Sequence, residues 1–167
     1  MSAHSDRTVA SLSTPIGRLD VVASAVAVVE IRFADDSPDA ESPVPVDHPV
    51  LGSALLQLDE YFAGFRTEFD LPLDPTGTAF QREVWAVLRT VPYGETISYG
   101  EQASRLGDRN KSRAVGAANG RNPIPIVVPC HRVVGSDGRL TGFAGGLAAK
   151  AWLLDHERRI STTGDTR

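Results

Sequence analysis

A chain of 167 residues with 41% hydrophobic and 23% charged residues is long enough to bury a hydrophobic core, and it fits one domain or two small ones. Its single cysteine excludes an internal disulfide and a multi-cysteine metal site, and it favours a reducing, cytoplasmic setting. The N-terminal segment has no uninterrupted apolar stretch, and no window approaches the roughly 20 apolar residues that cross a bilayer, so the sequence predicts neither export nor membrane insertion.

Charge is divided unevenly along the chain, and the formal net charge of −4 argues only weakly against a nucleic-acid partner. From Asp20 to Asp74, twelve acidic residues face two arginines. From Ser104 to Arg139, seven basic residues face two aspartates. This division predicts two surfaces with different partners, and a pattern that serves solubility alone is the alternative.

The first predicted elements are β-strands followed by a helix. Residues 7–33 are rich in Val, Ile and Thr and are interrupted by a Pro-Ile-Gly turn, which predicts two or three antiparallel strands. The acidic, proline-rich residues 34–49 are expected to form a surface loop, with His48 a loop residue rather than a ligand. From Val50 onward, apolar residues recur at helical intervals, which predicts a helix that covers one face of the sheet.

A linker is expected in residues 70–77, where prolines and a glycine interrupt any regular pattern. We place the boundary between two halves of the chain in this segment. The sequence therefore predicts an N-terminal domain of residues 1–74, with a sheet and a helix. It predicts a second, C-terminal domain of residues 75–167.

Short helices are predicted at the start of the second domain. Thr78 followed by Gln81 forms a capping-box signature before an amphipathic stretch, and Ser98 followed by Glu101 repeats it. Another short helix is expected over residues 110–120. Two short helices across a glycine-containing turn, with basic residues at the start of the second, resemble a helix-turn-helix, although many helical hairpins touch no DNA.

The lone cysteine lies in the stretch VVPCHRVV. The preceding IPIVVP segment is interpreted as a short buried strand, which would put Cys130 at the strand end, facing a cleft. A buried, inert cysteine is the alternative, because free Cys behaves as a small hydrophobe. His131 beside it can lower the thiol pKa or act as its base. Neighbours on an extended chain point to opposite faces, so a bridging water or a local bend is expected rather than a direct bond.

Two further polar residues are candidates for the same site. Glu157 falls on or beside the apolar face of the helix predicted for residues 145–159, where a carboxylate needs a partner. One alternative is an ordinary salt bridge with a basic residue such as Arg158. The other is a hydrogen bond to His131, by which the carboxylate would fix the tautomer of the imidazole. Asn122 either forms the turn before the strand or gives a hydrogen bond to the site.

Five motifs of the second half resemble the family of O6-alkylguanine-DNA alkyltransferases, in the order and spacing of that family. The motifs are VPYGETISYGE, RAVGAANGRNP, PCHRVV, TGFAGG and LLDHE, and the resemblance spans about residues 78–157. The first half is similar only in layout to the ribonuclease-H-like domain of the family. The resemblance implies an α/β (α+β) fold, with an N-terminal ribonuclease-H-like antiparallel sheet and helices and a mainly helical C-terminal domain with a helix-turn-helix.

The resemblance implies direct-reversal repair of DNA. An O6-alkylguanine, and also an O4-alkylthymine, would be flipped out of duplex DNA, and its alkyl group would move irreversibly to Cys130 without any cofactor or metal. His131 would activate the thiol through a water and Glu157 would orient His131. Tyr99 would donate a proton or hydrogen bond to the departing base, and Asn122 would organise the site beside the thiol.

The family pattern also implies how DNA is held. Arg113 would enter the vacated position in the duplex, or as an alternative would contact a phosphate. Small residues would permit a close approach of the recognition helix to the minor groove, and backbone atoms would read the edge of the flipped base. The first group is Ala114, Ala117 and Ala118, and the second is Cys130, Val133 and Ala144.

Two residues of the expected alkyl pocket depart from the family pattern. Phe143 stands where members often carry Tyr, and Ala144 stands where Ser or Gly is common. These departures concern the range of alkyl groups accepted more than the reaction.

The expected partner is alkylated double-stranded DNA, with no membrane contact, and we expect a monomer or a cooperative assembly on DNA. The expected location is the cytoplasm, at the nucleoid in a bacterium. Three other functions are alternatives: a non-catalytic protein that recognises alkylated DNA, a cysteine hydrolase and a transcription regulator. The first lacks the reactive cysteine that is present here, the second needs an oxyanion hole, and the third leaves Cys130 and Tyr99 without a role.

Overall fold

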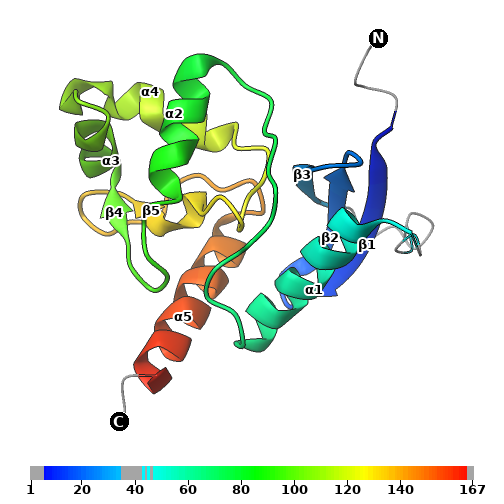
Figure 1. Cartoon of the computed structure of the whole chain (residues 1–167). Helices are drawn as coiled ribbons and strands as arrows, with labels where there is room; N and C mark the ends of the chain where they lie inside the picture. Colours follow the sequence, from blue (N-terminus) through cyan, green and yellow to red (C-terminus); the bar gives the residue numbers. More distant parts are fainter. Residues whose placement is uncertain (1–5, 35–42, 44, 46, 165–167) are drawn as a thin grey trace. The chain divides into compact units, whose positions relative to one another are not determined.

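The computed structural model describes residues 6–34, 43, 45 and 47–164, and backbone contacts divide the chain into two units, Met1–Thr76 and Gly77–Arg167 (Figure 1). In the first unit, strands β1 (Thr8–Thr14), β2 (Gly17–Ala23) and β3 (Val28–Phe33) form an antiparallel sheet in the order β1-β2-β3. The predicted antiparallel strands are therefore confirmed. The turn between β1 and β2 uses Gly17 at a φ of +104°, a conformation that favours glycine.

Helix α1 (Pro49–Ala63) lies against one face of this sheet (Figure 1). Its N-terminus is capped by His48, whose Nδ1 accepts the backbone N–H of Leu51 at 3.2 Å. His48 is therefore a helix cap. Most of the acidic loop that precedes it lies outside the described residues. The buried residues of α1 recur at helical spacing and form one face of the helix. They are Leu51, Ala54, Leu55, Gln57, Leu58 and Tyr61.

The second unit is mainly helical. Its elements are α2 (Ala79–Leu88), β4 (Ile97–Ser98), α3 (Tyr99–Arg105), η2 (Arg109–Lys111), α4 (Ser112–Gly120), η3 (Cys130–Arg132), β5 (Val133–Val134) and α5 (Leu147–Gly164). In the part of the chain that the structure describes, no helix combines the length and the apolarity that crossing a membrane requires.

Local capping explains where the first helices of this unit begin. Thr78 Oγ1 accepts the N–H of Gln81 at 3.1 Å, and Gln81 Oε1 accepts the N–H of Thr78 at 2.9 Å, so the predicted capping box is present. Ser98 Oγ accepts the N–H of Glu101 at 3.1 Å, whereas the Glu101 carboxylate pairs with Arg105. Both predicted helix starts are therefore confirmed.

Buried polar contacts fix the packing of α2, α3 and α4. The indole N–H of Trp85 on α2 donates to the carbonyl of Ala118 on α4 at 2.8 Å. Gln102 on α3 and Asn119 on α4 exchange two amide hydrogen bonds of 3.0 and 2.8 Å. These bonds satisfy groups that are almost fully buried, so they hold the helices in one arrangement.

The predicted strand before Cys130 is wrong. Residues 124–128 form a tight turn in which Pro125 and Val128 make a single bridge and Ile126 has a φ of +75°. The physical reason is that Pro123, Pro125 and Pro129 have no N–H to donate to a strand ladder. The parallel pairing that does form lies beyond the cysteine and joins β4 to β5.

Candidate active site

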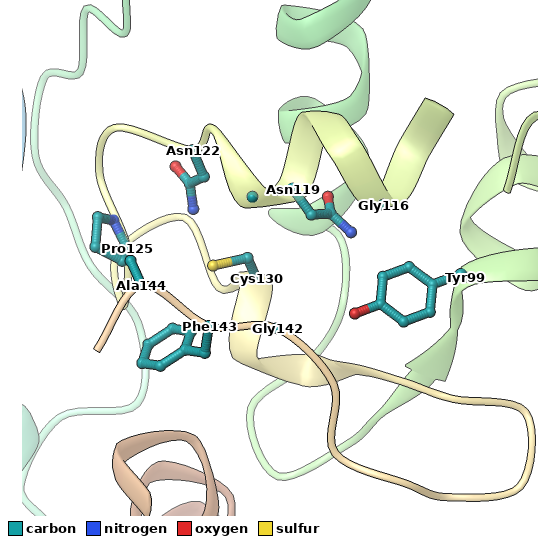
Figure 2. A pocket seen from close by; sticks show the side chains of 10 residues that line it. Tyr99, Gly116, Asn119, Asn122, Pro125, Cys130, Gly142, Phe143 and Ala144 are labelled. Carbon is teal, nitrogen blue, oxygen red and sulfur yellow. The ribbon is translucent and has the colours of Figure 1, made fainter. Parts of the chain in front are cut away.

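Cys130 is the first residue of η3 and lies in the wall of a pocket of about 300 Å³. The thiol is half-buried, so it is held in place and still reaches the pocket. Figure 2 shows Cys130 between Asn122 and Phe143, with the ring of Tyr99 at the other side of the pocket. Helix α4, the turn before Cys130 and the loop before α5 contribute the remaining lining residues.

Asn122 braces the turn that carries Cys130. Its Oδ1 accepts the N–H of Ile124 at 3.0 Å, and its Nδ2 donates to the carbonyl of Val128 at 2.8 Å. The N–H of Cys130 donates to the same Val128 carbonyl at 2.8 Å. Asn122 therefore forms the turn before Cys130, which is the first alternative predicted for it, and it also lines the pocket beside the thiol.

His131 and Glu157 form a buried pair. Nε2 of His131 lies 2.7 Å from Oε2 of Glu157, and both side chains are almost completely buried. Because an ionised carboxylate only accepts hydrogen bonds, Nε2 carries the proton in this contact. A neutral imidazole then keeps its lone pair on Nδ1, which is buried and has no hydrogen-bond partner within the described residues. Nδ1 is therefore the atom that can take up a proton.

Arg132 holds the other side of the Glu157 carboxylate. Its Nε donates to Oε1 at 2.8 Å and its NH2 group donates to Oε2 at 3.1 Å, a two-pronged contact in the protein interior. Its NH1 group donates to the carbonyl of Val91 at 2.7 Å. The N–H of Gly94, at a φ of +81°, adds a contact of 3.3 Å to Oε1.

The pKa shifts fit this arrangement. Burial alone would raise the pKa of Glu157, but the hydrogen bonds and charges of His131 and Arg132 outweigh burial and hold that pKa well below its ordinary value. Burial lowers the pKa of His131, and the Glu157 hydrogen bond opposes this only in part. The site therefore combines an ionised carboxylate with a neutral imidazole, which is the protonation state of a base.

The thiol itself sits in a mixed environment. Burial raises the pKa of Cys130, while the Asn122 side chain and the positive charge of Lys150 oppose the rise. Lys150 on α5 is buried, and its Nζ donates to the carbonyls of Val133 and Thr141, both at 2.7 Å. A cation close to a thiol favours the thiolate, which is the nucleophilic form.

Tyr99 and Phe143 form opposite parts of the pocket wall (Figure 2). The Tyr99 hydroxyl lies 2.8 Å from Oγ1 of Thr141. The Phe143 ring packs against the His131 ring at a centroid distance of 6.4 Å and an angle of 75°. Ala144, the other residue that departs from the family pattern, also lines the pocket.

Four of the residues proposed for DNA contact lie on α4. Arg113, Ala114 and Ala117 are exposed on this helix, whereas Ala118 is buried and receives the Trp85 hydrogen bond. Ala118 therefore belongs to the packing between α2 and α4. Val133 is buried in β5, and its carbonyl accepts the Lys150 ammonium.

Sequence reasoning missed three residues of this site: Arg132, Lys150 and Thr141. The first was counted among the basic residues of a surface, yet it is buried. Arg158 is exposed, whereas the buried Glu157 pairs with His131 and Arg132, and Arg159 pairs with Asp155 at 3.0 Å. The only available signal was that a buried carboxylate needs a cation, which does not say which one.

Taken together, the geometry can activate a thiol for attack on an electrophilic carbon in a pocket of small-molecule size. The half-buried Cys130 is next in sequence to the neutral imidazole of His131, and that imidazole is hydrogen-bonded to the ionised carboxylate of Glu157. Within residues 6–34, 43, 45 and 47–164, no cluster of three or more His, Cys, Asp or Glu side chains is placed to hold a metal ion.

Comparison with known protein families gives two matches. The model described as "6-O-methylguanine DNA methyltransferase, ribonuclease-like domain" matches residues 9–75. The model described as "6-O-methylguanine DNA methyltransferase, DNA binding domain" matches residues 79–159. Together they cover most of the chain, and the first confirms the ribonuclease-like layout expected for the N-terminal half.

Individual relatives are similar over almost their whole length. The methylated-DNA–protein-cysteine methyltransferase of Mycolicibacterium paratuberculosis is 47% identical over 152 residues, which are 90% of this chain and 92% of that protein. The crystal structure of the Mycobacterium tuberculosis O6-methylguanine methyltransferase matches with a TM-score of 0.82 at 41% identity, over 95% of this chain and 99% of that one. A crystal structure of Mycobacterium tuberculosis OGT in complex with DNA matches with a TM-score of 0.82 at 44% identity, over 91% and 93% of the two chains.

Proposed function

This chain belongs to the 6-O-methylguanine DNA methyltransferase family, and from that premise we propose that Cys130 accepts the methyl group of an O6-methylguanine in duplex DNA. The function is direct-reversal DNA repair, and the activity is that of a methylated-DNA–protein-cysteine methyltransferase. The observation that carries the role of Cys130 is its position in a pocket, next in sequence to the buried His131–Glu157 pair.

The transfer requires the thiolate of Cys130, because the neutral thiol is a poor nucleophile. His131 takes the thiol proton on Nδ1 through a bridging water molecule. Glu157 keeps the other ring proton on Nε2 and stabilises the imidazolium that forms. Arg132 neutralises Glu157, so the carboxylate stays ionised in the protein interior. The Lys150 charge favours the thiolate as it develops.

The methyl carbon then moves from O6 of guanine to the sulfur of Cys130. The carbon–sulfur bond forms as the carbon–oxygen bond breaks, and the electron pair of the broken bond stays on the guanine. Tyr99 donates a proton or hydrogen bond to this departing base from across the pocket. A thioether is not cleaved by these groups, so each protein molecule reacts once.

DNA is the partner, and exposed residues of α4 support its assignment as the helix that enters the minor groove. Ala114 and Ala117 put only small side chains on the exposed face of this helix, which permits a close approach of its backbone to the duplex. Arg113 is exposed at its start and would fill the position that the flipped base leaves, because flipping costs a few kcal/mol of stacking and pairing. The backbone of Cys130, Val133 and Ala144 would read the edge of the base.

Mass spectrometry of the intact protein and of its peptides tests this function. The protein is mixed with an equal amount of a duplex oligonucleotide that carries one O6-methylguanine. We expect a single methyl group on Cys130, restoration of the lesion to guanine, and no further reaction when more DNA is added.

The Cys130→Ser variant is the control for binding. It should bind the same duplex and acquire no methyl group. An unmodified Cys130 in the wild-type protein despite tight binding would contradict the proposal and would instead indicate a protein that only recognises the lesion.

A further inference from the structure

Thr141 contacts the residue that faces the departing base. Its Oγ1 lies 2.8 Å from the Tyr99 hydroxyl, although the two residues are 42 positions apart in the sequence. Thr141 is in the loop between β5 and α5, directly before the pocket residues Gly142, Phe143 and Ala144. Figure 2 shows the Tyr99 hydroxyl directed toward this loop. The contact therefore joins the two sides of the pocket.

The backbone of Thr141 is held at the same time. Lys150 donates to the carbonyls of Thr141 and Val133, each at 2.7 Å, and the Lys150 side chain is buried. The Thr141 carbonyl is 3.5 Å from the Tyr99 hydroxyl and already accepts the stronger Lys150 bond. The short contact of Tyr99 is thus with the Thr141 hydroxyl. The backbone of Thr141 is fixed by the buried Lys150 ammonium.

We propose that Thr141 is a positioning residue for methyl transfer, acting through Tyr99. Its hydroxyl donates to the Tyr99 oxygen and leaves the Tyr99 proton free for the departing guanine. This inference rests on the proposed function, in which Tyr99 serves that base. When the proton passes to guanine, negative charge develops on the Tyr99 oxygen, and a hydrogen bond that already points at that oxygen strengthens. Solvent water returns the proton to Tyr99 after the transfer.

Two substitutions of Thr141 separate its hydroxyl from its shape. Thr141→Val removes the hydroxyl and keeps the branched side chain, whereas Thr141→Ser keeps the hydroxyl. The measurements are the single-turnover rate of methyl transfer at saturating O6-methylguanine duplex, and the Kd for that duplex in the Cys130→Ser background. We expect Thr141→Val to lower the maximal rate about tenfold, the effect of one lost hydrogen bond, with Kd unchanged and Thr141→Ser within about twofold of the wild type.

The Tyr99→Phe background tests whether Thr141 acts through Tyr99. In the Tyr99→Phe protein, Thr141→Val should cause no further loss of rate, because the Tyr99 hydroxyl that Thr141 positions is already absent. The same loss in both backgrounds would mean that Thr141 only shapes the loop, and it would overturn the inference. A Thr141→Val rate equal to that of the wild type would do the same. Failure of the wild-type protein itself to methylate Cys130 would instead overturn the proposed function, so the two failures are distinguishable.

Discussion

The Glu157 carboxylate pairs with His131 and with Arg132, and the Glu157→Gln substitution affects these two contacts differently. Glutamine still offers an oxygen to His131, but it cannot neutralise the buried guanidinium of Arg132. We expect the free energy of unfolding to fall by about 3–5 kcal/mol, because a buried charge is left without its counter-charge. We also expect methyl transfer to slow about 100-fold, because His131 becomes a weaker base. Urea unfolding and single-turnover kinetics measure the two effects.

Arg132→Met in the Glu157→Gln background separates stability from proton transfer. No buried charge then remains at this position, so the double variant should regain most of the lost stability. Its methyl transfer should stay slow, since His131 still lacks the carboxylate. A double variant that transfers the methyl group at the wild-type rate would show that Glu157 has only a structural role.

At the scale of single residues, the sequence motifs identified several residues of the site. They missed residues whose roles depend on packing. The residues alone left the partner of Glu157 open, the family resemblance paired it with His131, and the structure contains that hydrogen bond. The sequence did not reveal the role of Arg132, because a long side chain can reach many partners. The neighbouring residues in the sequence do not show that the Arg132 side chain turns inward. Thr141 was missed because its partner Tyr99 is distant in the chain.

At the scale of elements, the amide pair between α3 and α4 is expected to couple the two helices. Gln102→Leu leaves the buried Asn119 amide without its partner, and Asn119→Leu does the same to Gln102. Each single variant should therefore lose about 1–3 kcal/mol of unfolding free energy. The double variant should lose less than the sum, because no unpaired amide remains between the helices. Urea unfolding of the four proteins measures this coupling, and strictly additive losses would contradict it.

The same scale shows which elements can be predicted from sequence. Helix starts were predicted correctly where a capping residue acts within three residues of its partner, as at Thr78 and Ser98. The segment before Cys130 was predicted as a strand because its residues are apolar and β-branched. Its prolines already argued against a strand, and the side-chain bonds of Asn122 to Ile124 and Val128 complete the turn.

At the scale of the whole molecule, the unit that carries the site has its own spectroscopic signal. Both tryptophans, Trp85 and Trp152, belong to the Gly77–Arg167 unit that carries the site. Tryptophan fluorescence therefore reports the unfolding of this unit. The unit also contains His131 and Glu157, whose pKa values make its stability depend on pH.

Acidification should destabilise the Gly77–Arg167 unit. The pKa of His131 is lowered from its ordinary value of 6.5, so below that pH the unfolded chain binds a proton that the folded chain does not. The pKa of Glu157 is lowered from 4.5, so its contribution is present above that pH and is lost as the pH falls toward the folded value. In both cases the unfolded state binds more protons, so the free energy of unfolding rises with pH.

Urea unfolding followed by tryptophan fluorescence between pH 7 and pH 5 measures the His131 contribution, with a slope of up to about 1.4 kcal/mol per pH unit for one proton. His131→Asn keeps a donor for Glu157 and removes the titrating ring, so its slope should be smaller. A slope that His131→Asn leaves intact would assign the pH dependence to another group, because the folded state would then not be holding this imidazole neutral.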